Sequence, residues 1–263
     1  MKRHLVFSLL VLIFISFMFG NITSAKQTEG IDIKKGLTTY LKLDQNISQI
    51  IDSVGKIEIE NKGTTVKNDS IKFDGQNDYI NLKNFNFKNL GQGTISLWFK
   101  VEDIPTEDAI RPILYYGAKD PCLNMPDASN QGLIIEVAHD PMHFRSENLY
   151  FTIFADGCKY PSFCFDSKTP MEENVWYHFV AIVSEDYNTG YLNGQEMTNR
   201  RYNFGNSNDS EFFEDAAKDE AFWIGKGYWD AKEMFFKGNI KNIRIYDRPI
   251  NEDEIEYLYQ NQL

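Results

Sequence analysis

Oxygen-bearing side chains gather in one short turn of the chain, at Asp74, Asn77 and Asp78. Carboxylate and amide oxygens are ligands that Ca²⁺ prefers, in sets of about six to eight that include backbone carbonyls. The same residue types also form turns by bonding their own backbone, which gives the turn a purely structural interpretation. The sequence therefore marks this turn as a candidate calcium site, with Asp78 as a candidate ligand, and leaves the turn-forming role open.

A second candidate site is the aromatic stretch of Tyr228, Trp229 and Asp230, which we expect in a loop between two strands. Flat aromatic faces stack on sugar rings, and loops on a rigid scaffold often carry binding residues. Asp230 and Asn193 would supply hydrogen bonds to such a ligand. These four residues form the predicted ligand-binding set. The alternative is that Trp229 packs into the edge of the fold, since large aromatic side chains are mostly buried.

The sequence offers no catalytic residue that we can nominate. The nearest carboxylate cluster, residues 136–140, places its acids on a strand end and the loop after it. Glycoside hydrolysis with retention needs two carboxyl groups about 5 Å apart, one of them with a raised pKa. The chain also has no Gly-x-Ser-x-Gly nucleophile motif. We expect a non-catalytic protein, and a glycoside hydrolase or polysaccharide lyase with an unrecognised carboxylate site is the alternative.

The N-terminus has the pattern of a secretory signal peptide. A basic start at residues 1–4 precedes the apolar run 5–19, and small residues end the pattern at Ala25. The apolar run is shorter than the ~20 residues of a membrane span, although a retained N-terminal anchor is the alternative. Cleavage after Ala25 would leave 238 of the 263 residues and change the formal net charge from −11 to −13. A secreted, extracellular or periplasmic protein is expected.

This acidity argues against nucleic acid as a partner, because no run of Lys or Arg in the sequence reverses it locally. An exported chain also permits disulfides. Cys158 and Cys164 close a small loop and are the best pair by proximity, which leaves Cys122 over. Other pairings, or three reduced thiols, remain alternatives.

The elements that must position these residues are short strands. The segment 94–101 alternates most clearly, with Ile95, Leu97, Phe99 and Val101 on one face. Further strands are expected at 37–44, 70–73, 79–82, 112–116, 132–137, 149–154, 176–183, 190–192, 221–225 and 240–246. Asn251 opens a short C-terminal helix as its N-cap, with Glu254 at the capping-box position. About a dozen strands separated by turns predict an all-β, two-sheet antiparallel sandwich.

Seven segments, in this order, resemble the laminin G-like and concanavalin A-like jelly-roll superfamily over residues 36–262. They are residues 40–44, 73–80, 94–99, 176–180, 191–194, 236–250 and 253–255. The resemblance implies two curved antiparallel sheets of six to seven strands each. It sets the domain organisation as a signal peptide at 1–25, a polar leader at 26–35 and a sandwich domain at 36–263.

The resemblance also implies function. Members of the superfamily mostly bind glycans or extracellular proteins, often with a structural or bridging Ca²⁺. Asp44 and Asn242 match family positions near strand ends, so Asp44 joins Asp78 as a candidate calcium ligand. The chain departs from relatives resembling laminarinases, because it lacks their Glu-x-Asp-x-x-Glu strand. We therefore expect a secreted, non-catalytic module that binds a carbohydrate or an extracellular protein. A structural adhesion module without a small ligand is a further alternative.

Overall fold

The computed structural model describes residues 30–44, 49–55, 57–119, 132–140, 145–154, 163–167, 169–198, 210–216, 220–229 and 232–263. One compact unit runs from Ile31 to Leu263. The predicted signal peptide and the first four residues of the predicted leader lie outside the described residues. Among the residues that are described, no helix is both long and apolar enough to cross a membrane.

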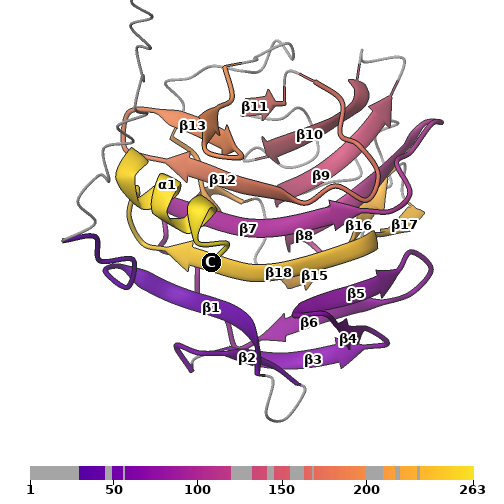
Figure 1. Ribbon diagram of the computed structural model, residues 1–263, viewed down its shortest axis with the longest axis horizontal. Helices are drawn as coiled ribbons and strands as arrows, with labels where there is room; N and C mark the ends of the chain where they lie inside the picture. Colours follow the sequence, from indigo (N-terminus) through magenta and orange to yellow (C-terminus); the bar gives the residue numbers. More distant parts are fainter. Residues whose placement is uncertain are drawn as a thin grey trace, which may run out of the picture. The chain divides into compact units, whose positions relative to one another are not determined.

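The unit is a sandwich of two large antiparallel sheets, as predicted (Figure 1). The first sheet has nine strands. In spatial order they are β14 (Gln195–Glu196), β13 (Asn188–Leu192), β12 (Tyr177–Val183), β7 (Gly93–Val101), β18 (Lys237–Tyr246), β1 (Leu37–Asp44) and β2 (Gln49–Asp52), with β5 (Ser70–Asp74) paired to β18 and β4 (Thr65–Lys67) paired to β5.

The second sheet has seven strands. They are β11 (Phe163–Asp166), β10 (Arg145–Ile153), β9 (Gly132–Asp140), β8 (Ala109–Gly117), β15 (Ala221–Ile224), β6 (Tyr79–Lys83) and β3 (Glu58–Lys62). A separate hairpin of β16 (Lys226–Trp229) and β17 (Lys232–Phe235) packs against β8. The short helices are the 3₁₀ turn η2 (Phe213–Asp215) and α1 (Glu252–Gln260).

The core lies between the two large sheets, and strand alternation places its side chains. Ile95, Leu97, Phe99 and Val101 of β7 all lie in this core, as their spacing predicts. The turn at 74–78 joins β5 of the first sheet to β6 of the second, so the chain crosses between sheets there. The polar segment 45–68, which is not among the expected strands, contributes β2, β3 and β4 at sheet edges, where polar side chains face solvent.

The C-terminal helix covers part of the outer face of the nine-stranded sheet (Figure 1). Ile255 and Leu258 pack there against Val180 and Tyr246. The predicted capping box is confirmed, because Asn251 accepts a hydrogen bond from the Glu254 amide while the Glu254 carboxylate accepts one from the Asn251 amide. The apolar stripe of α1 covers only this part of the face.

Candidate functional site

The carboxylates of the predicted calcium turn are engaged by the turn itself. Asp74 Oδ1 accepts hydrogen bonds from the amides of Gln76 and Asn77 at 2.8 and 3.2 Å. Asp78 Oδ2 accepts one from the Asp74 amide at 3.0 Å. Burial, followed by the nearby charge of Asp74, raises the pKa of Asp78. The turn-forming interpretation accounts for these contacts.

Asp44 ends β1, and its side chain lies outside what the structure describes. Among the described residues, no group of three or more His, Cys, Asp or Glu side chains is placed to hold a metal ion. Asn242, the other family position, has a left-handed backbone (φ 55°) and bonds the Tyr40 hydroxyl and the Gln262 carbonyl. Calcium binding by Asp44 and Asp78 stays a prediction.

Two residues of the predicted ligand-binding set, Tyr228 and Asn193, belong to different sheets. Tyr228 and Trp229 lie in strand β16 rather than in the expected loop, because the segment pairs with β17. Tyr228 is only 5% exposed and its hydroxyl donates to the Lys119 carbonyl, so its ring packs inward. Asn193 lies in the β13–β14 turn of the other sheet, where its side chain accepts a hydrogen bond from the His178 amide. The Trp229 side chain and Asp230 lie outside the described residues.

The predicted disulfide cannot be placed in the same way. Cys122 and Cys158 lie outside the described residues. Cys164 lies in β11, opposite Thr152 of β10, and its side chain is not described. The pairing of Cys158 with Cys164 stays a prediction.

Two buried carboxylates share a row on the seven-stranded sheet. The sequence pointed to Glu136 as part of the 136–140 cluster, but not to Asp166 as its neighbour. Glu136 and Asp166 lie on its outer face, and Tyr150 of the strand between them pairs directly with both. Residues two strands apart in one row are separated by about 10 Å at their Cα atoms. The face around them is apolar and buried, with Tyr115 and Ile134 in the same cluster. Glu136 occupies the same alternating positions of β9 as Ile134 and Ala138, so the sequence pattern could have indicated a carboxylate on an apolar face.

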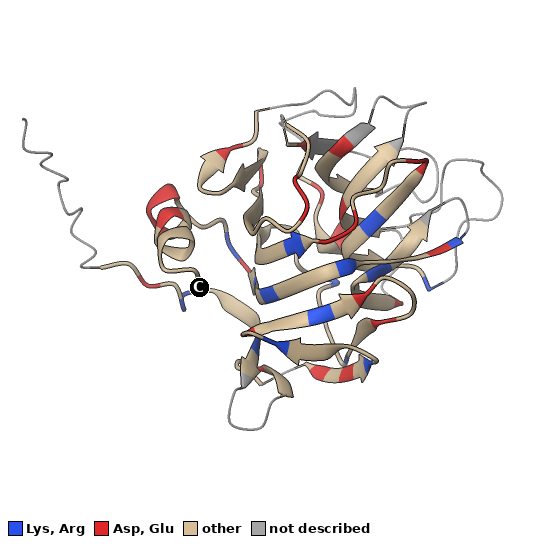
Figure 2. Cartoon of the chain, turned by 45° about the vertical axis from the view of Figure 1, so that its right-hand side comes forward, with Lys and Arg blue, Asp and Glu red and all other residues tan. Residues whose placement is uncertain are grey.

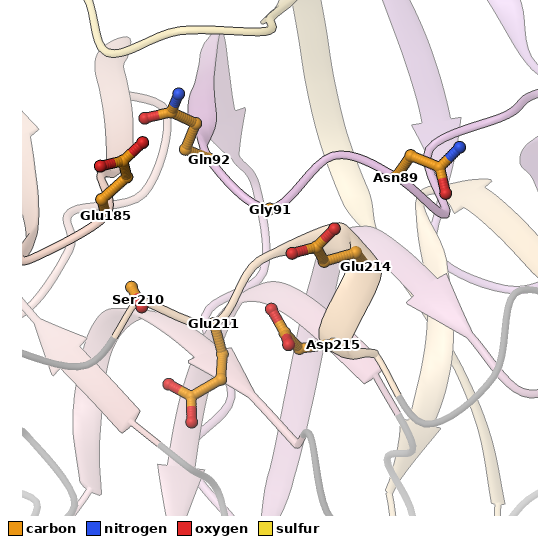
Figure 3. A pocket seen from close by; sticks show the side chains of 8 residues that line it. All are labelled: Asn89, Gly91, Gln92, Glu185, Ser210, Glu211, Glu214 and Asp215. Carbon is orange, nitrogen blue, oxygen red and sulfur yellow. The ribbon is translucent and has the colours of Figure 1, made fainter.

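An acidic hollow of about 640 Å³ lies beside η2 (Figure 3). Glu185 lines it from the turn before β13, while Glu211, Glu214 and Asp215 line it from the η2 segment. Asp215 is occupied locally, because its Oδ2 accepts a hydrogen bond from the Phe212 amide at 2.9 Å. A cluster of acids alone does not define a metal site, so this hollow carries no assignment.

The outer face of the nine-stranded sheet collects a different set of side chains, which we call the lysine face. It comprises Trp176 and the outward lysines Lys42, Lys72, Lys100, Lys237 and Lys241. Lys100 and Lys241 place their Nζ atoms 5.6 and 5.0 Å from the Trp176 ring centroid. Figure 2 shows basic segments on several neighbouring strands and acidic segments on the C-terminal helix.

A bulge in β18 helps to build the lysine face. The pairing with β7 shifts between Lys241 and Arg244, where Asn242 adopts its left-handed conformation. Residues three positions apart normally point to opposite faces of a strand. The extra residue of the bulge lets Lys241 and Arg244 point to the same, outer face. Arg244 is 2% exposed, lies 3.9 Å from the Tyr40 ring centroid, and donates to the Asn242 carbonyl at 3.3 Å. Its burial lowers the pKa of this guanidinium, which stays charged at neutral pH.

Aromatic rings pack between the nine-stranded sheet and α1, next to the lysine face. Trp98 is buried between sheet and helix, with its ring centroid 5.0 Å from His178 and 5.8 Å from Tyr259. His178 is fully buried and bonds the Ser96 hydroxyl through Nε2 at 3.0 Å. Sequence reasoning missed the lysine face because each strand contributes only one or two lysines. The strand order, which the sequence does not display, brings them together.

Comparison with known proteins found one matching family profile and several solved structures of similar fold. The profile of a family described as the concanavalin A-like lectin/glucanases superfamily matches residues 74–256. Similar solved structures include Trypanosoma rangeli sialidase in complex with sialic acid, at 17% identity and a TM-score of 0.60. Another is the botulinum neurotoxin serotype D binding domain, at 15% identity and a TM-score of 0.59. A comparison with curated proteins found no match.

The lengths of these structures differ from that of the chain. Each alignment covers 86% of this chain, but only 33% of the sialidase and 52% of the toxin domain. The chain thus spans about a third of the first and about half of the second. At these identities the likeness shows the fold alone.

Proposed function

Because the chain belongs to the concanavalin A-like lectin/glucanases superfamily, we propose that it is an exported protein that binds a carbohydrate through its lysine face. The observation that carries the proposal is the setting of Trp176. Its ring is half-buried at the surface, and the ammonium groups of Lys100 and Lys241 lie over it. Binding sites for small ligands combine aromatic surface with a few well-placed polar groups, and this patch supplies both.

Trp176 is well suited to this role among the four tryptophans. Trp98 and Trp223 are buried, and the Trp229 side chain lies outside the described residues. Trp176 directly precedes β12, a fully buried central strand, so its backbone is held by the sheet. A ring held in this way loses little freedom when a sugar stacks on it.

The test is binding to a polysaccharide panel, first on an array and then by calorimetry with and without EDTA. We expect Trp176→Ala to weaken binding by about 10-fold or more, because aromatic anchors dominate such contacts. Tyr187→Ala is the matched control, since Tyr187 is an aromatic that is 40% exposed in the β12–β13 turn. No binding to any polysaccharide, or equal binding by wild type and Trp176→Ala, would count against the proposal.

Export is the second part of the proposal, and it is supported by the signal-peptide pattern at 1–25. Mass spectrometry of the protein recovered from its native host tests it. We expect a mature chain that begins at Lys26. A chain that retains Met1 and the apolar run would indicate a membrane anchor instead.

A glycoside hydrolase or polysaccharide lyase is the second candidate function. Glu136 and Asp166, in one row on either side of Tyr150, favour it, because carboxyl pairs cleave glycosidic bonds. It ranks second because both carboxylates are at most 1% exposed, so a substrate does not reach them in this conformation. Release of reducing ends from a polysaccharide panel, lost in Glu136→Gln, would establish it.

The adhesion-module alternative finds less support. Among the described residues, only Val175 and Tyr187 are large hydrophobic side chains that are exposed. An adhesion surface without a small ligand is usually a contiguous apolar patch.

A further inference from the structure

Charge on the lysine face points to a specific class of carbohydrate. Resting on the proposed function, we propose that this face selects polyanionic glycans, whose sulfate or uronate groups are bound by Lys42, Lys100, Lys237 and Lys241. Of these lysines, Lys100 and Lys241 lie over the Trp176 ring. The chemistry shared by the two glycan types is a repeated, fully ionised oxyanion on a sugar backbone.

The register of the strands spaces the lysines regularly. Lys72 of β5 and Lys100 of β7 flank Asn239 of β18 in one row, so their Cα atoms lie about 10 Å apart. Lys241 lies two residues further along β18, opposite Trp98, which places it about 7 Å from that row. The positive charges therefore spread in two directions over the outer face of the sheet, a layout that suits a chain carrying several anions.

Four of these five lysines form no ion pair with a carboxylate that the structure describes. Lys72 pairs with Glu102. Within the described part of the chain, no carboxylate forms an ion pair with Lys42, Lys100, Lys237 or Lys241. Asp74, which lies opposite Lys237, is engaged by the amides of its own turn. Four ammonium groups are thus available to an external anion.

Arg244 adds a fixed positive charge beneath the face. It forms no ion pair with any carboxylate among the described residues, and it stacks on the same Tyr40 ring that Lys42 approaches to 5.8 Å. A buried charge is screened by solvent less than an exposed one. Because it cannot reach the ligand from there, its role is to strengthen the local potential.

The rest of the molecule favours a glycan over a nucleic acid. The chain carries a net charge of −11, and acidic residues such as Glu252 and Glu256 lie on α1, which covers another part of the same sheet face. A long polyphosphate would have to pass over these acidic neighbours, which repel it. A flexible glycan that binds through a few residues does not need to extend beyond the lysines.

The test compares matched polysaccharides by calorimetry at several salt concentrations. Dextran sulfate is paired with dextran, and polygalacturonate with its methyl ester. We expect the charged member of at least one pair to bind, with an affinity that falls as salt rises, because salt screens exposed charges. Lys100→Glu with Lys241→Glu is expected to weaken this binding by about 10-fold or more.

The control carries the same charge change elsewhere. Lys34→Glu with Lys88→Glu replaces two exposed lysines outside the face, and we expect it to bind like wild type. Lys100→Gln with Lys241→Gln is a milder variant that keeps the test valid if charge reversal disturbs folding, which circular dichroism would reveal.

The possible results separate the two proposals. Binding of neutral dextran that depends on Trp176 but not on Lys100 and Lys241 would overturn the anion selectivity and leave the carbohydrate function standing. No binding of any polysaccharide would overturn both. Single-stranded DNA that binds as tightly as dextran sulfate would overturn the selectivity for glycans.

Discussion

Mild acid is expected to destabilise the protein through His178. Burial, and secondly the positive charge of Arg244, lowers the pKa of this imidazole from 6.5 to about 3. The unfolded chain therefore binds a proton as the pH falls through 6.5, whereas the folded chain does so only near pH 3. The unfolded state binds more protons between these values, so stability is complete above pH 6.5 and is lost progressively below it.

The size of this effect follows from the pKa difference. Each pH unit within the window removes about 1.4 kcal/mol of folding free energy. A fall from pH 6.5 to pH 4.5 therefore costs roughly 2 kcal/mol through this one residue. That is a large share of the 5–15 kcal/mol that a domain typically has.

Urea unfolding of wild type and His178→Gln between pH 7 and pH 4.5 measures this contribution. Glutamine keeps a polar partner for the Ser96 hydroxyl but does not titrate, and the other titrating groups are common to both proteins. We expect the stability advantage of wild type to shrink by roughly 2–3 kcal/mol from the top to the bottom of this range. Trp98→Phe, which alters the ring stacked on His178, is expected to keep the wild-type pH slope. Parallel curves for wild type and His178→Gln would refute the reasoning.

Three further predictions concern other parts of the fold. Glu254→Gln is expected to cost about 1–2 kcal/mol in urea unfolding, because Glu254 both caps α1 and pairs with Arg248; an unchanged midpoint would contradict this. Gly225→Ala is expected to cost about 2 kcal/mol or more, because its φ is +82° and an added Cβ would lie 2.5 Å from the Phe73 ring; wild-type stability would show that the ring yields freely. If calcium binds at the predicted turn, Ca²⁺ raises the melting temperature of wild type but not of Asp78→Asn, and equal shifts would exclude that ligand.

Local patterns in the sequence were enough to predict the sandwich. Alternation placed Ile95 and Leu97 of β7 in the core, because one face of each strand in a sandwich packs against the opposite sheet and must be apolar. The Asn193–Gly194 turn was also predictable, since both residues have the positive φ that a tight hairpin requires. These features depend on residues close together in the chain.

The candidate site could not be predicted in this way. Lys72, Lys100 and Lys241 stand alone in their own strands and become neighbours only through the order β5–β18–β7. Tyr228 was interpreted as a loop residue because its segment is short and glycine-rich, whereas pairing with β17 makes it a strand and turns its ring inward. The grouping of the lysines and the strand conformation of Tyr228 both depend on which strands pair. That pairing cannot be read from a single sequence.

The place of β18 in the sheet has a consequence for how the protein folds. This strand is the last in the chain, yet it lies at the centre of the nine-stranded sheet, between β7 and β1. Until residues 237–246 are available, the flanking strands have no partner at the middle of the sheet. Most contacts of this sheet also join residues far apart in sequence, which slows folding. The nine-stranded sheet is thus expected to be completed only after residues 237–246 have been synthesised, although most of its strands precede them.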